Sequence, residues 1–120
     1  MRMGRCVLAI TIAVAVAACG LNIPDINARP DKYYQKKVSF VGRIARTQVL
    51  SPDTLLEIAD ARDHRILVRS SKPVDATTGD WVKVTGVLVP QAVVGDKTIY
   101  DVVSAEKVSR TRAPRLANLL

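Results

Sequence analysis

The sequence predicts an all-β domain, a small five-stranded Greek-key barrel with a short N-terminal helical turn, preceded by a cleaved signal peptide. Three observations predict it. Short segments in which apolar and polar residues alternate recur along the chain, as strands with one buried face require. Two of these segments carry an interior glycine, Gly42 or Gly86, which is typical of strands that bend or bulge. The first eighteen residues are basic and then apolar, and they stand apart from this pattern.

Residues 1–18 have the order of a secretory signal peptide. Arg2 and Arg5 precede an uncharged run over residues 6–18, which as a helix would span only about 20 Å. Because the hydrocarbon core of a bilayer is about 30 Å thick, we expect a signal that is removed on export rather than a membrane-spanning anchor. A buried N-terminal helix is the less favoured alternative, since the segment is apolar on all faces.

A cysteine follows the apolar run directly. Val16-Ala17-Ala18-Cys19-Gly20 resembles a bacterial lipobox, in which small residues precede a cysteine whose thiol is the nucleophile for lipid attachment. The resemblance implies cleavage before Cys19, a diacylglyceryl thioether on its sulfur and acylation of the new amino group. Two or three acyl chains anchor a protein firmly to a membrane. An ordinary signal cleaved after Ala18, with Cys19 incidental, is the alternative.

The two cysteines and the residue after Cys19 predict a location. Cys6 is lost with the signal and Cys19 is taken by lipid, so we expect no disulfide. In the lipoproteins that the lipobox resembles, Asp after the cysteine is associated with retention at the inner membrane, and Gly20 stands there instead. The resemblance therefore implies a lipid-anchored protein of the bacterial envelope, at the outer membrane and facing the periplasm.

The mature chain divides into a tether, a barrel and a tail. Residues 19–29 comprise the lipidated cysteine and a tether with a proline and two asparagines. Residues 30–37 begin with Pro and then Asp, which is typical of a short helical turn. We expect the barrel over residues 30–109 and a basic tail over residues 110–120.

Four segments alternate with a period of two residues and are expected to be strands. The first places Val38, Phe40 and Ile44 on one face, where we expect Phe40 to join the core. The last two are separated by Gly95-Asp96, a hairpin signal. The four expected strands cover residues 38–44, 64–69, 80–89 and 98–105.

Residues 51–61 fit two structures. They begin with Ser-Pro-Asp, which is typical of a helix N-terminus. Leu56 and Ile58, however, continue the alternation of a strand. The polar turn at 62–63 leaves too little chain to return after a helix, so we favour a strand that pairs with residues 64–70.

Two of the strands carry a more specific pattern. Residues 37–44 (KVSFVGRI) and 79–87 (GDWVKVTGV) resemble the first and fourth strands of bacterial OB-fold modules of the tRNA-anticodon-binding-like type. The resemblance covers residues 30–109. A more distant one is to Slp-type outer-membrane lipoproteins, in which a lipidated cysteine precedes a comparable barrel. The segment between the third and fourth strands is too short for the helix that often closes an OB barrel, so Tyr33 and Tyr34 are expected to cover that end.

The formal net charge of +7 is unevenly distributed. Residues 19–109 hold 13 bases and 11 acids, whereas nucleic-acid binding usually needs a dense basic stripe. None of the five aromatic residues lies on the second or third expected strand, where OB folds bind bases. An outward patch remains as a candidate binding site for an oligonucleotide or another anionic polymer, with a solvated barrel face as the favoured alternative: Arg43, Arg65, Arg69, Trp81 and Lys83.

Groups suited to catalysis are sparse. His64 is the single histidine and stands in an expected turn near Asp60 and Asp63, where a solvated turn residue is the simpler interpretation. The chain has no glycine-rich phosphate loop and no metal-ligand spacing. We therefore expect no enzyme and no cofactor. The favoured function is a binding or structural module that is held to a membrane through Cys19 and engages a protein or another envelope component, with nucleic acid as the less favoured partner.

Overall fold

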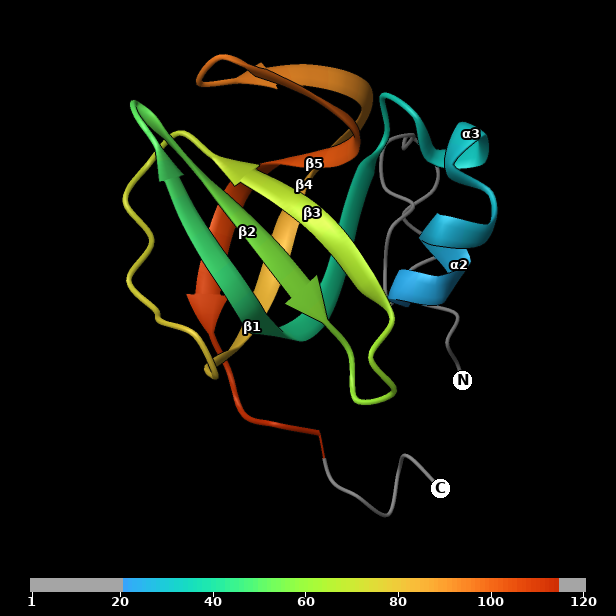
Figure 1. The fold of residues 1–120 in the computed structure, drawn as a ribbon. Coiled ribbons are helices and arrows are strands. Elements are labelled where there is room, and N and C mark those ends of the chain that lie inside the picture. The colour runs from blue at the N-terminus through green and yellow to red at the C-terminus, as the bar shows by residue number, and fades with distance from the viewer. Residues whose placement is uncertain (1–20, 115–120) are drawn as a thin grey trace.

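The computed structural model describes residues 21–114, which form a five-stranded closed barrel with two short helices at its side (Figure 1). The expected signal peptide and Cys19 lie outside these residues. In chain order the elements are α2 (Ile23–Ala28), α3 (Pro30–Tyr33), β1 (Lys37–Leu50), β2 (Asp53–Ala59), β3 (Arg65–Ser70), β4 (Trp81–Val94) and β5 (Lys97–Arg110). The turn expected after Pro30 is helix α3.

The barrel closes in the strand order β1-β2-β3-β5-β4. Neighbouring strands are antiparallel except for β3 and β5, which run parallel. This arrangement is the five-stranded barrel expected from the sequence, so the predicted fold class is confirmed.

The strands match the expected segments, and three of them are longer. Residues 51–61 contain strand β2, so the helical alternative is wrong: Leu56 and Ile58 are fully buried, while Leu55 and Glu57 are partly exposed. Strands β1, β4 and β5 each have 14 residues. Each of them continues into a hairpin, and toward the end of the hairpin buried and exposed residues no longer alternate regularly. The alternation in the sequence therefore ends before the strand does.

Gly42 and Gly86 stand where two strands approach too closely for a side chain. A Cβ on Gly42 would lie 2.5 Å from Ile58 Cγ2, and one on Gly86 would overlap the carbonyl oxygen of Ser104. The pairing of β4 with β5 shifts at Gly86, as an interior glycine predicts. In β1 the shift comes further along, after Ile44.

Residues 21–29, expected to be a tether, contain helix α2 instead, and the folded part begins before residue 30. Ile23 and Ile26 lie three residues apart on one helix face, are each 1% exposed and belong to the hydrophobic core. Pro24 suits the first turn of a helix. Two buried isoleucines gain about 1.5–3 kcal/mol each from leaving water, which a solvated tether would forgo.

Helix α2 packs against the core beside the start of β3, and Val74 and Ala76 of the β3–β4 segment also pack against the core. The Asn27 side chain donates a hydrogen bond of 2.8 Å to the Arg65 carbonyl oxygen at the start of β3. Tyr33 and Tyr34 also pack against the core. The Tyr34 hydroxyl donates to the Asp101 carboxylate, and this hydrogen bond is the main reason that the pKa of Tyr34 is raised.

The described core lies within residues 21–108, so a chain that starts at residue 20 retains the whole barrel. Over residues 21–114, neither helix has the length and apolar character needed to cross a bilayer.

Candidate functional site

Two of the three arginines in the predicted patch, Arg43 and Arg65, pair with Asp63 in the β2–β3 turn. Asp63 Oδ1 lies 3.3 Å from Arg43 Nη2 and 2.8 Å from Arg65 Nη2, and Arg65 Nη1 lies 3.0 Å from Glu57 Oε1. The hydrogen bond to Asp63 is the first cause of the raised pKa of Arg65. These exposed pairs add little stability, but they neutralise much of the positive charge that an anionic polymer would need.

Arg69 lies apart from the other patch residues. It faces outward on β3 four residues beyond Arg65, or about 13 Å along the strand. Its Nη2 donates a hydrogen bond of 2.7 Å to Ser104 Oγ on β5, and its buried Nε has no hydrogen-bond partner. Arg69 therefore joins two strands and does not extend the charge around Asp63.

Trp81 and Lys83 lie on the outward face of β4. Trp81 pairs across the strands with Arg43, and Lys83 pairs with Val41. Trp81 is partly buried and Lys83 is exposed, and within residues 21–114 the Lys83 ammonium makes no ion pair or hydrogen bond. The structure thus brings Arg43 beside Trp81 and Arg65, and it separates Arg69 from them.

The β2–β3 turn is organised by one carboxylate. Asp60 Oδ1 accepts hydrogen bonds from the backbone amides of Arg62 at 2.9 Å and His64 at 2.8 Å, and Asp60 Oδ2 lies 2.9 Å from His64 Nδ1. His64 is exposed, so its place in the turn agrees with the sequence interpretation. In the described part of the chain no cluster of three His, Cys, Asp or Glu residues is arranged to hold a metal ion.

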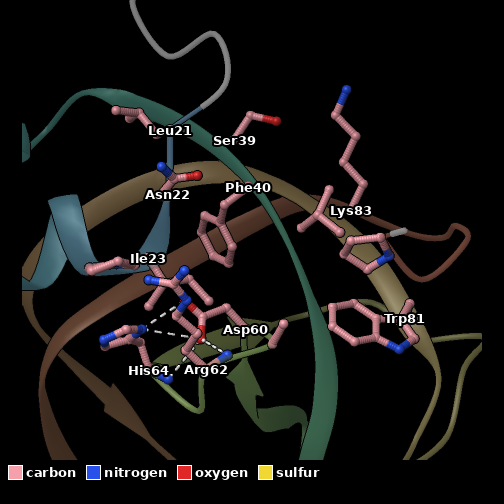
Figure 2. Close-up of a pocket in the computed structure, with 14 residues that line it drawn as sticks. Leu21, Asn22, Ile23, Ser39, Phe40, Asp60, Arg62, His64, Trp81 and Lys83 are labelled. Atoms are coloured by element: carbon pink, nitrogen blue, oxygen red, sulfur yellow. Dashed lines mark hydrogen bonds and ion pairs between the residues drawn. The ribbon is translucent and has the colours of Figure 1, made fainter. Parts of the chain in front are cut away.

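A cleft of about 640 Å³ lies between the first described residues, β1, the β2–β3 turn and β4. Figure 2 shows Phe40 between Ile23 and Trp81, with Asp60, Arg62 and His64 grouped at the turn. The cleft combines apolar and polar residues, namely Leu21, Ile23, Pro24, Phe40, Val41, Ala61, Trp81 and Pro114 with Asn22, Ser39, Asp60, Arg62, His64 and Lys83.

The sequence did not predict this cleft, because its walls come from five separate segments. One of them was expected to be a tether. The signal that was present is the pair Ile23 and Ile26, whose spacing fits one face of a helix.

A second feature that the sequence did not predict is an apolar surface at two hairpin tips. Val49 at the end of β1 is 69% exposed, and Val93 and Tyr100 on the β4–β5 hairpin are 62% and 63% exposed. The two tips touch, since a Cβ on Gly95 would lie 3.0 Å from Leu50 Cβ. We call Val49, Val93 and Tyr100 the tip surface.

Comparison with solved structures identifies the fold. A protein described as an aspartyl-tRNA synthetase of Leishmania major Friedlin matches with a TM-score of 0.62 and 11% identity over 88% of this chain and 23% of that chain. A chain of the S. pombe Stn1–Ten1 complex matches with a TM-score of 0.55 and 15% identity over 90% of each chain. U. maydis replication protein A bound to single-stranded DNA also gives 0.55 and 15%, over 79% of this chain and 73% of that chain.

These similarities concern the fold alone, because the sequences are so different. This chain spans less than a quarter of the length of the synthetase that it matches. Neither a protein-family model nor a curated protein matches the sequence. The chain has the OB fold, as its strand pattern predicts.

Proposed function

We propose that this protein is a lipid-anchored OB-fold module of the bacterial envelope, held at the outer membrane through Cys19, that binds a protein partner and catalyses no reaction. The single observation that carries the binding role is the tip surface, three large apolar side chains exposed on adjoining hairpins. Exposed apolar side chains favour association, because a partner that covers them removes them from water.

The geometry of the tip surface suits a protein partner. Tyr100 lies opposite Gln91 and diagonal to Val93, so both apolar side chains stand on one face of the β4–β5 hairpin. Tyrosine is enriched among the interface residues that dominate binding energy. The related fold in the Stn1–Ten1 complex belongs to a protein that assembles with another protein.

The direction of the tips is consistent with a membrane anchor at residue 19. In Figure 1 the ends of the β1–β2 and β4–β5 hairpins lie at the upper left, whereas α2, which begins four residues after Cys19, lies at the right. An anchor at Cys19 would therefore leave the tips pointing away from the point of attachment and open to a partner.

The anchor is tested by metabolic labelling with an alkyne analogue of palmitate. We expect label on the native chain and on Cys6→Ser, and none on Cys19→Ser, which should accumulate as uncleaved precursor because no other thiol stands at the cleavage site. Label that persists on Cys19→Ser would overturn the lipid anchor.

The partner surface is tested by a photo-crosslinking amino acid at position 100 of the full chain in intact cells. We expect one adduct of defined mass, and we expect Val93→Asp in the same chain to remove it. The matched control places the crosslinker at Asp75, which is exposed in the β3–β4 segment away from the tips. The same adducts from both positions, or no adduct at position 100, would contradict binding at the tip surface.

Single-stranded nucleic acid is the second candidate partner, favoured by the similarity to replication protein A bound to single-stranded DNA. The pairing of Arg43 and Arg65 with Asp63 argues against it. With a labelled oligonucleotide and residues 20–120, we expect no salt-sensitive rise in fluorescence anisotropy at micromolar protein. A binding constant that falls steeply with added salt would make nucleic acid the partner.

A further inference from the structure

We infer that the cleft beside β1 and β4 binds an alkyl chain that ends in an anionic group, such as a fatty acid or a phospholipid with one acyl chain inserted. This site is separate from the tip surface, and the inference does not depend on a protein partner or on the lipid anchor. It rests on three features of the cleft: an apolar floor, a cationic rim, and an acid, Asp60, whose carboxylate already accepts hydrogen bonds within the protein.

The floor of the cleft is apolar over much of its length. Phe40 and Ile23 lie beneath it and are almost fully buried, so the apolar surface open to a ligand belongs to other lining residues. Val41 is 38% exposed and Trp81 is partly buried at one side, so both offer apolar surface that a ligand would cover. A volume of about 640 Å³ falls within the range of about 300–1,000 Å³ that is usual for small organic ligands.

The rim of the cleft carries cations from two elements. Lys83 stands across from Val41 on β4, and its ammonium has no partner within residues 21–114. Arg62 and His64 line the other side at the β2–β3 turn. A carboxylate or phosphate beside Lys83 would gain a charge-assisted hydrogen bond at the mouth of an apolar cleft.

Asp60 is the one acid among the described lining residues, and it does not oppose an anion strongly. Its carboxylate already accepts hydrogen bonds from the amides of Arg62 and His64 and faces the His64 ring. The unmatched charge at the cleft is therefore positive, on the side of Lys83. An apolar floor with one positive end matches a ligand with an alkyl chain and one negative end.

Trp81 allows a direct test, because it is the single tryptophan of the chain and lines the cleft. Residues 20–120 are titrated with octanoate, decanoate and decanol below their micelle concentrations, and Trp81 fluorescence is followed. We expect saturable binding of decanoate. Burial of one methylene is worth a factor of about four in affinity, so octanoate, which is two methylenes shorter, should bind roughly 15-fold more weakly. Decanol, which lacks the charge, should bind at least about 5-fold more weakly.

Substitutions assign the binding to this cleft. Lys83→Gln should weaken decanoate about 5-fold, whereas Lys97→Gln, at the distant β4–β5 tip, should leave the affinity unchanged. Val41→Asp should abolish binding. Both Lys83 and Val41 face outward, so these variants should unfold at the same urea concentration as the native chain, which circular dichroism verifies.

The source of the ligand is distinguished with vesicles of phosphatidylglycerol. Quenching of Trp81 by vesicles that carry brominated acyl chains, reduced in Lys83→Gln, would support a membrane lipid as the source. Binding of decanoate without vesicle quenching would support a free amphiphile. Absence of any saturable change with either probe, or equal affinity for decanol and decanoate with no effect of Lys83→Gln, would overturn the inference.

Discussion

Asp60 is the side chain on which the β2–β3 turn depends most. Desolvation by burial would raise the pKa of Asp60, but the hydrogen bonds from the amide and ring of His64 and from the amide of Arg62 outweigh it, so the pKa lies below its ordinary value of 3.8. The folded pKa is therefore lower than the unfolded one. The contribution of Asp60 to stability is complete above the unfolded pKa and is lost as the pH falls through the folded pKa.

We therefore expect the free energy of unfolding of residues 20–120 to decrease as the pH falls below about 5, and to decrease less in Asp60→Asn. Urea denaturation followed by circular dichroism measures both. Asp75→Asn is the control, because the exposed Asp75 side chain makes no hydrogen bond or ion pair within residues 21–114. Equal losses in Asp60→Asn and in the native chain would contradict this role of Asp60.

Helix α2 was not predicted from the sequence, and its packing against the core should contribute strongly to the free energy of unfolding. Ile26 is almost fully buried in the core, so Ile26→Ala removes apolar contacts and leaves a cavity at an expected cost of about 2–5 kcal/mol. Asn27→Ala, on the same helix, removes only the hydrogen bond to the Arg65 carbonyl and should cost about 0.5–1.5 kcal/mol. Urea denaturation compares them. A similar small cost for both variants would indicate that α2 contributes little to stability.

The elements that repeat a pattern could be predicted from the sequence, and those that do not repeat could not. Val38, Phe40 and Ile44 revealed β1 because three inward residues define a period. Ile23 and Ile26 give a single spacing of three residues in a six-residue helix. A single spacing does not define a period.

The candidate sites depend on tertiary contacts that no local pattern encodes. The sequence shows Arg43 and Arg65 as two positive charges, but it does not show that Asp63 neutralises them. The β2–β3 turn places Asp63 between the two arginines, and the φ angle of Asp63 is 69°. The cleft and the tip surface each join segments far apart in the chain, so their residues could be named from the sequence but not brought together.

The position at which the folded unit begins affects both the barrel and the cleft. The sequence placed that start at residue 30, whereas the core includes Ile23 and Ile26. A chain of residues 30–120 should lose about 3–6 kcal/mol of stability relative to residues 20–120, the sum for two buried isoleucines. It should also expose Trp81 more fully, since Leu21, Ile23 and Pro24 line the cleft with it. Thermal denaturation and the emission maximum of Trp81 measure the two effects.

The comparison is not affected by charge, because residues 20–29 carry one acid and one base and their removal leaves the net charge unchanged. A lower midpoint with red-shifted emission would therefore report lost packing. Equal midpoints and emission for the two chains would mean that the barrel is complete without α2.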